Sequence, residues 1–223
     1  MVLVNVICCE VDMKLVEAIS EIGEESAVAM AKIYAIGNQV NWDDEAQYVF
    51  AAVARDKSRV PGNIGGKNDT AESAIQKWVL KYRKGLDGRA SNRVSNPPGT
   101  KPDPIIETII SSRLNVISQE TLEKIILGHR LAMSAENILG VILEEYLSVN
   151  LKDSGWHCAW GETVKSVDFV NENGMLLQIK NRSNSENSSS SSVREGTSIK
   201  KWYRINATTG AFFWSKLNQI CNI

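Results

Sequence analysis

The chain has 223 residues, of which 43% are hydrophobic and 23% are charged, and its formal net charge is −1 at pH 7. This composition is typical of a soluble globular protein with one sizeable core. The sequence contains no uninterrupted apolar run of about 18 residues and no signal-peptide pattern, so we expect a cytoplasmic protein that does not enter a membrane. Two histidines, and four cysteines without metal-ligand spacing, argue against a zinc site.

The first part of the chain has mostly helical periodicity, interrupted by turn residues. Residues 95–104, SNPPGTKPDP, form a turn-rich connector. We therefore expect a mostly helical N-terminal part over residues 1–104 and a separate core over residues 105–223. The ranges with helical spacing of apolar residues are 11–37, 43–57, 70–83, 105–114 and 121–131.

Residues 134–150, SAENILGVILEEYLSVN, predict a further helix that begins at Ser134. Apolar residues at helical spacing give it one buried side. Glu136, Gly140 and Glu144 follow one another at intervals of four and share another side. We expect Gly140 to open space beside Glu144. The alternative is that these glutamates belong only to a solvated acidic surface.

Residues 167–181, VDFVNENGMLLQIKN, predict a β-hairpin whose turn spans residues 171–174. In its second strand, period-two alternation places Gln178 and Lys180 on one face. Asp168 lies at the far end of the first strand, so pairing across the turn brings it opposite them. A carboxylate, an amide oxygen and an ammonium group are therefore expected to share one small patch.

This patch predicts metal-assisted hydrolysis of a phosphodiester. Mg²⁺ takes oxygen ligands, and its protein sites commonly provide one or two carboxylates beside the substrate phosphate. We expect Asp168 to be the main ligand. Lys180 is placed to orient or activate the attacking water and to offset charge that develops on the phosphate.

Asp168, followed after nine residues by Gln178-Ile-Lys180, resembles the D-(x)n-(D/E)-x-K core of the PD-(D/E)xK nuclease superfamily. Val167 stands in place of the proline, and Gln178 replaces the second acid. The resemblance implies an α/β fold, a restriction-endonuclease-like mixed sheet flanked by helices, with the order helix, strand over residues 155–164, strand with Asp168, strand with Lys180.

The resemblance also implies a source for the missing negative charge. The segment GVILE, residues 140–144, is similar to the helix that carries an active-site glutamate in this superfamily. Glu144 is therefore the expected second metal ligand and a further active-site carboxylate, together with Asp168 and the weaker ligand Gln178. Glu145 and Glu136 remain alternatives on the same helix.

The segments GWHCAWGETVKSVDFV and AENILGVILEEYL resemble the SinI-type restriction endonucleases over roughly the C-terminal half. The resemblance implies a type II enzyme that cleaves double-stranded DNA at GGWCC with Mg²⁺, leaves 5′-phosphates, acts as a homodimer and is paired with a cytosine methyltransferase. Two alternatives stay open. One is a structure-selective repair or junction nuclease of the same fold, and the other is a catalytically silent DNA-binding protein, which the replacement at Gln178 favours.

Two basic segments flank the acidic patch and predict contacts with DNA phosphates. Residues 77–101 contain seven Lys or Arg and one acid, and a second segment runs from Arg194 to Lys216. We expect residues 181–216 to read the bases, with arginines contacting guanine and asparagines contacting adenine or cytosine. The alternatives are solvated basic loops and a mobile polar tract over residues 181–192. The predicted DNA-binding residues are Arg89, Arg93, Arg182, Asn184, Asn187, Arg194, Lys200, Lys201 and Arg204.

Overall fold

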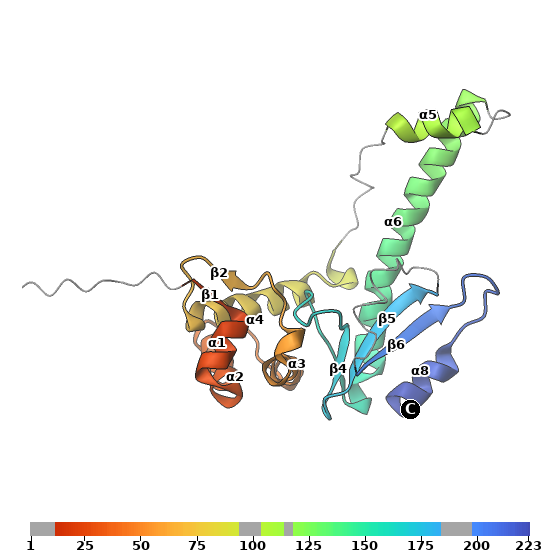
Figure 1. The fold of residues 1–223 in the computed structure, drawn as a ribbon. Helices are drawn as coiled ribbons and strands as arrows, with labels where there is room; N and C mark the ends of the chain where they lie inside the picture. The colour runs from red at the N-terminus through yellow and green to blue at the C-terminus, as the bar shows by residue number, and fades with distance from the viewer. Residues whose placement is uncertain (1–11, 94–103, 114–117, 184–197) are drawn as a thin grey trace, which may run out of the picture.

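The computed structural model describes residues 12–93, 104–113, 118–183 and 198–223. A group of N-terminal helices lies beside a sheet, and the long helix α6 (Gln119–Asn150) runs past the sheet and projects from the body of the molecule (Figure 1). The described residues therefore form a mixed α/β fold.

The N-terminal elements are mostly helices, and their bounds differ in part from the sequence prediction. The single helix expected over residues 11–37 is wrong, because Gly23, with φ +86°, separates two helices. The helix expected over residues 70–83 starts after Thr70, whose side chain accepts a hydrogen bond from the Ser73 amide (3.2 Å). The elements are β1 (Met13–Lys14), α1 (Leu15–Ile22), α2 (Glu24–Gly37), α3 (Asp44–Arg55), η1 (Lys57–Arg59), β2 (Gly65–Gly66), α4 (Ala71–Asp87) and η2 (Ala90–Asn92).

The C-terminal elements build a four-stranded mixed sheet in the order β3-β4-β5-β6. The pairs β3–β4 and β4–β5 are antiparallel, whereas β5–β6 is parallel. Helix α6 packs against β3 and β5, α3 packs against β3 and β4, and α8 packs against β6. The elements are α5 (Pro104–Arg113), α6, η3 (Lys152–Ser154), β3 (Trp156–Cys158), β4 (Phe169–Asn171), β5 (Leu176–Arg182), β6 (Ile199–Ile205) and α8 (Trp214–Cys221).

Two predicted boundaries in this half are wrong. The helices expected over residues 121–131 and 134–150 are one continuous helix, because residues 131–134 contain no glycine or proline to end the first. Its N-cap is Ser118, not Ser134. The strand expected over residues 155–164 ends at Cys158, and the chain then loops through Gly161 (φ +74°) and Glu162 (φ +55°).

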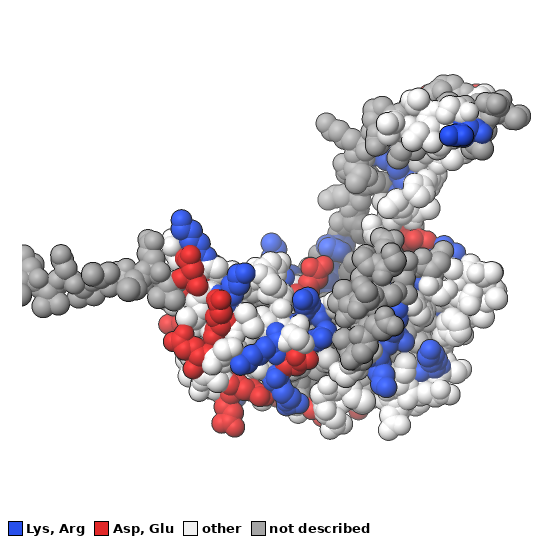
Figure 2. Space-filling model, viewed as in Figure 1, with Lys and Arg blue, Asp and Glu red and all other residues white. Residues whose placement is uncertain are grey.

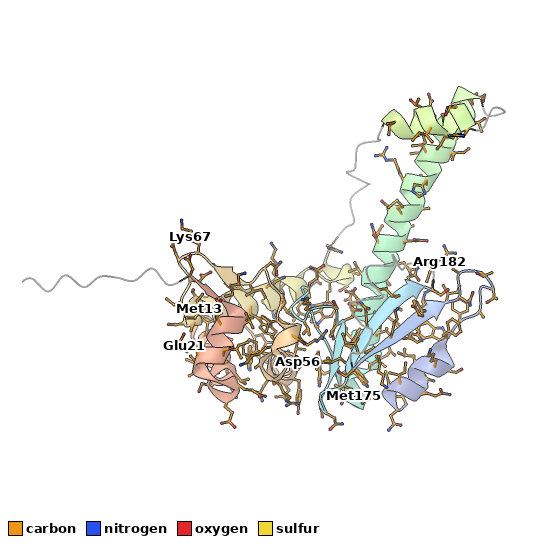
Figure 3. The ribbon with its side chains drawn as sticks, in the orientation of Figure 1. Met13, Glu21, Asp56, Lys67, Met175 and Arg182 are labelled. Carbon is orange, nitrogen blue, oxygen red and sulfur yellow. The ribbon has the colours of Figure 1, made fainter. Side chains whose placement is uncertain are left out.

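The predicted hairpin is confirmed. Phe169 pairs with Leu177, and the Asn171 amide donates to the Met175 carbonyl (2.8 Å) across a three-residue loop. Gly174 closes that loop with φ +82°, the left-handed conformation that three-residue hairpin loops place at a glycine. Met175 and Arg182, labelled in Figure 3, mark the two ends of the second strand region.

One continuous hydrophobic core joins the helical half to the sheet. The side chains of Trp78, Trp156 and Trp202 are all fully buried, one in the helical half and two in the sheet. Separation of the two halves would therefore expose their shared core to solvent. The position of each half depends on its packing against the other.

Helix α6 is, among the residues that the structure describes, the one helix long and apolar enough to cross a membrane by length and composition alone. The sequence prediction considered only uninterrupted apolar runs, whereas α6 contains charged residues within its apolar stretch. None of the residues in the apolar stretch itself is buried, but Leu143 and Leu147 in the C-terminal part of α6 are buried, and α6 packs against β3 and β5. Composition is therefore weak evidence for a membrane span.

Candidate active site

A cavity of about 980 Å³ lies between α4, α6, β5 and the loop that joins β3 to β4. The cavity is lined both by the four residues that the sequence singled out and by several further cations. Figure 2 shows Lys and Arg side chains beside Asp and Glu over the middle of the molecule, with acidic side chains gathered over the N-terminal helices. The four predicted residues that line this cavity are Glu144, Asp168, Gln178 and Lys180.

The backbone holds Asp168 at the start of the hairpin. Its amide donates to the Leu177 carbonyl (2.9 Å), and its carbonyl accepts from the Ala159 amide (2.8 Å). One carboxylate oxygen, Oδ2, also accepts from the Ile179 amide at 2.7 Å. These bonds fix the carboxylate next to Gln178, on the strand opposite, so the hairpin assembles the patch that its sequence predicts.

The side-chain oxygen of Gln178 is the atom that most directly indicates a cation site. Its side chain is only 7% exposed, and its Oε1 atom is buried without a hydrogen-bond partner among the described residues. A buried oxygen without a partner costs stability, and native proteins rarely keep one unless a ligand or an ion satisfies it. Because Asp168 lines the same cavity from the paired segment of the hairpin, this oxygen fits a hard divalent cation.

Glu144 faces the same cavity from α6, and its electrostatic environment shows which groups surround it. Burial raises the pKa of Glu144 to about 7, and the nearby Asp168 carboxylate acts in the same direction. The charges of Arg93 and Lys180 partly oppose this rise in the pKa. Two carboxylates and a lysine are thus within electrostatic reach of one another.

The other two glutamates on α6 have partners elsewhere. Glu145 accepts from the Ser91 amide (2.7 Å) and pairs with Arg89 (3.2 Å), and these contacts, the Ser91 hydrogen bond first, lower the pKa of its carboxyl. Glu136 pairs with Arg182 at 2.9 Å. Of the three candidate glutamates, Glu144 is the one that lines the cavity.

Two further observations qualify the sequence prediction around Glu144. The expected role of Gly140 is wrong, because a Cβ atom built there would meet no atom within 4 Å, so this glycine does not mediate a close approach. Among the described residues, no three His, Cys, Asp or Glu side chains group as a metal site. A cation would therefore depend on two carboxylates and the Gln178 amide oxygen.

Sequence reasoning missed Glu162, which also lines the cavity and raises the pKa of Glu144. The prediction that residues 155–164 form a strand concealed it. The available signal was the Gly161-Glu162 pair, since glycine indicates a turn. Both residues have positive φ values, and this turn lines the cavity.

Five further cations form a basic wall of the cavity, and α4 carries two of them, Lys81 and Lys84. Trp78 Nε1 donates to the Thr163 carbonyl (2.9 Å), which joins α4 to the loop between β3 and β4. Farther along α4, a Cβ atom on Gly85 would overlap the backbone of Gly161, and a Cβ atom on Gly161 would overlap the Lys81 carbonyl of α4. The cations of the basic wall are Lys81, Lys84, Arg89, Arg93 and Lys165.

The residues predicted to bind DNA fall into several positions. Arg89 and Arg93 line the cavity. On β6, Lys201 pairs with Gln178 and so shares its face of the sheet, whereas Lys200 pairs with Leu177 and points the other way. The remaining described residues have partners: Arg182 pairs with Glu136, and Arg204 Nε donates to Asn181 Oδ1 (2.8 Å). Asn184, Asn187 and Arg194 lie outside the described residues.

Carboxylates, an amide oxygen and a lysine beside a basic wall are typical of metal-dependent enzymes that cleave phosphodiesters. Comparison with known families agrees with this class. The family described as SinI restriction endonuclease matches residues 31–222, so the chain belongs to that family.

Two curated relatives are similar to the chain. The type II restriction enzyme Eco47I of Escherichia coli is 46% identical over 127 residues, which cover 55% of each chain. The type II restriction enzyme SinI of Salmonella infantis is 43% identical over 123 residues, or 53% of each chain. The chain thus spans about half the length of the curated relatives it matches.

Proposed function

We propose that this protein is a type II restriction endonuclease that hydrolyses phosphodiester bonds in double-stranded DNA at a specific site. The observation that carries the proposal is the buried Gln178 Oε1 atom, which has no described hydrogen-bond partner and belongs to a residue that lines the same cavity as Asp168. Family membership and the names of both relatives support the same activity. The core is proposed to be of the PD-(D/E)xK type.

Asp168, Glu144 and Gln178 are the residues that would hold a divalent cation, with Mg²⁺ the best match to three oxygen donors. When bound, the cation stabilises negative charge on the phosphate and lowers the pKa of a coordinated water. Because burial raises the pKa of Glu144 to about 7, its carboxyl group must lose a proton before it binds a cation.

Lys180 lies two residues after Gln178, on the same face of β5, and lines the cavity. Its ammonium group is positioned to orient the attacking water through Nζ and to offset charge on the phosphate. The cations of the basic wall would bind phosphates on either side of the cleaved bond. Asp168 and Glu144 repel those phosphates, so a cation at the site is required for the backbone to approach.

We further propose the partners and specificity that the family resemblance implies. The target is GGWCC, the products carry 5′-phosphates, and the enzyme works in the cytoplasm as a homodimer beside a cytosine methyltransferase. A homodimer suits a two-fold symmetric site because each subunit then faces one strand.

The test is cleavage of two plasmids that differ only in whether they contain GGWCC, with and without Mg²⁺. We expect discrete fragments from the first plasmid alone, and none when its cytosines are methylated. Asp168→Ala and Lys180→Ala should each abolish cleavage, while Glu145→Gln, a residue bonded to Ser91 and Arg89, should retain it. Cleavage that persists in Asp168→Ala would remove this residue from the site.

Gln178 favours one alternative, a catalytically silent DNA-binding protein, because an amide replaces a negatively charged ligand. Substitution separates the two functions. Gln178→Glu should lower the Mg²⁺ concentration needed for half-maximal cleavage if the chain is an enzyme, whereas Gln178→Leu should raise it. DNA binding without cleavage under all metal conditions would support the silent binder instead.

A further inference from the structure

The loop that joins β3 to β4 is fastened to the helical half of the molecule and presents a glutamate to the cavity. Thr163 in this loop is buried, whereas Glu162 beside it is exposed and lines the cavity. The Trp78 indole donates to the Thr163 carbonyl (2.9 Å), and the Lys165 amide donates to the Arg59 carbonyl (2.8 Å). These two hydrogen bonds lie on either side of the exposed turn, so the fold itself fixes the position of Glu162.

Glu162 has a backbone conformation that a glutamate rarely adopts. Its φ is +55°, directly after Gly161 at +74°. Glycine adopts such values readily, whereas the Cβ atom of most other residues crowds the backbone there. Residues in this region persist only where surrounding contacts hold them, and they gather at functional sites. The strain therefore points to a use for the glutamate side chain itself.

Two ordinary roles of a carboxylate do not account for Glu162. Lysines and arginines line the same cavity, yet the Glu162 side chain forms no ion pair or hydrogen bond with any residue that the structure describes. In the same described segments, no three His, Cys, Asp or Glu side chains group as a metal site that would include it. Its charge nevertheless acts within the cavity, since it raises the pKa of Glu144.

The chemistry of a carboxylate limits what it can contact in double-stranded DNA. An ionised carboxylate accepts hydrogen bonds and donates none, and the phosphates repel it. In the major groove the only donors are amino groups of the bases. Adenine presents the N7 acceptor beside its amino group, which repels the second carboxylate oxygen, whereas cytosine presents its N4 amino group alone. Cytosine N4 is therefore the base donor that best fits a single glutamate.

We propose that Glu162 is a specificity-determining residue that accepts a hydrogen bond from the N4 amino group of a cytosine in the major groove. The fastened loop suits this role, because a group that reads a base must be held in place by its surroundings. The same negative charge disfavours DNA that lacks the cytosine, since it repels phosphates without gaining a donor. This inference rests on the proposed endonuclease function, which makes double-stranded DNA the ligand of the cavity.

The first experiment compares cleavage of duplexes that contain the proposed target GGWCC, with N4-methylcytosine at one of its two cytosine positions at a time. The methyl group replaces the N4 hydrogen that faces the major groove and leaves the other for base pairing. Methylation at one position should slow wild-type cleavage at least about 10-fold. Glu162→Ala should cut that duplex and the unmethylated one at equal rates. The matched control is Glu21→Ala, at an exposed glutamate of α1 labelled in Figure 3, which should discriminate as the wild type does.

The second experiment measures DNA binding in Ca²⁺ and separates base reading from a structural role. Glu162→Ala should bind the target about 10-fold more weakly, because it loses the cytosine contact. It should bind DNA without the target more tightly, because it no longer repels the phosphates. A variant that merely damaged the loop would bind both more weakly. The Mg²⁺ concentration needed for half-maximal cleavage should not rise, as expected for a residue that holds no cation.

A second variant keeps the test valid if Glu162→Ala fails to fold. Glycine adopts a φ of +55° without strain, so Glu162→Gly should raise the thermal unfolding midpoint. The same variant should lose the discrimination against N4-methylcytosine. A gain in stability together with a loss of specificity is the result expected of strain that is kept for function.

Three results would overturn the role of Glu162. They are a wild type indifferent to N4-methylcytosine at both positions, a Glu162→Gly variant that discriminates as the wild type does, and variants whose only defect is a higher Mg²⁺ requirement. Failure of the two proposals is distinguishable. A chain that binds the target with this discrimination but never cuts it contradicts only the proposed cleavage, whereas a chain that cuts GGWCC and ignores N4 methylation contradicts only the cytosine contact.

Discussion

Replacing Glu144 with glutamine should stabilise the protein in the absence of divalent cations. Burial raises the pKa of this carboxyl group in the folded state to about 7, above its ordinary 4.5, with the Asp168 carboxylate as the next cause. The difference between these pKa values corresponds to about 3 kcal/mol of stability. Because the side chain keeps some contact with solvent, we expect about 1–3 kcal/mol in measurement.

The sign follows from proton binding. Below pH 4.5 the carboxyl is neutral in both states, so its ionisation costs nothing. Between pH 4.5 and about 7 the unfolded chain releases the proton while the folded chain keeps it, so the wild type loses stability as the pH rises. Above about pH 7 the folded protein bears the full free-energy cost of ionising Glu144. Glutamine does not titrate, and the advantage of Glu144→Gln should therefore grow across this window.

Urea unfolding at a series of pH values, in a chelating buffer, measures this difference. Glu145→Gln is the matched control, since Glu145 has a lowered pKa and bonds to Ser91, and its replacement should destabilise the protein at high pH. Added Mg²⁺ should stabilise the wild type more than Glu144→Gln. A stability difference between wild type and Glu144→Gln that stays constant from pH 4.5 to 8 would refute the reasoning.

Three further changes test the two walls of the cavity. Trp78→Phe should lower the free energy of unfolding by at least about 2 kcal/mol, because it leaves the Thr163 carbonyl without its buried donor and opens a void. Urea unfolding measures this loss of stability. A loss below about 2 kcal/mol would mean that other contacts hold α4 in place. Lys84→Ala should weaken DNA binding in Ca²⁺ and reduce the slope of log affinity against log salt by about 1, whereas exposed Lys32→Ala on α2 should leave the slope unchanged. Gly85→Ala should lower both the thermal unfolding midpoint and the rate of DNA cleavage, because its Cβ atom would overlap the backbone of Gly161. An unchanged midpoint and rate would show that the backbone at this contact shifts without cost.

Local patterns were sufficient to predict the hairpin but not the extent of the helix before it. Alternating apolar residues and a turn glycine specify strand register, so the placement of Asp168 beside Gln178 follows from a dozen consecutive residues. Ser134 followed by Glu136 imitates a helix start, yet the chain there is already helical. A capping pattern marks a boundary only where the preceding residues cannot continue the helix, and here they can.

The basic wall was harder to predict, because it depends on contacts between distant segments. The excess of cations over residues 77–101 is visible in the sequence, but nothing local indicates that Lys84 lines the same cavity as Asp168. Their placement follows from the Trp78 hydrogen bond and from two glycines, Gly85 and Gly161, that only tertiary structure brings together. A glycine inside a helix normally weakens it, so Gly85 indicates close packing of another segment against α4. The sequence alone does not identify that segment, which is the loop at Gly161.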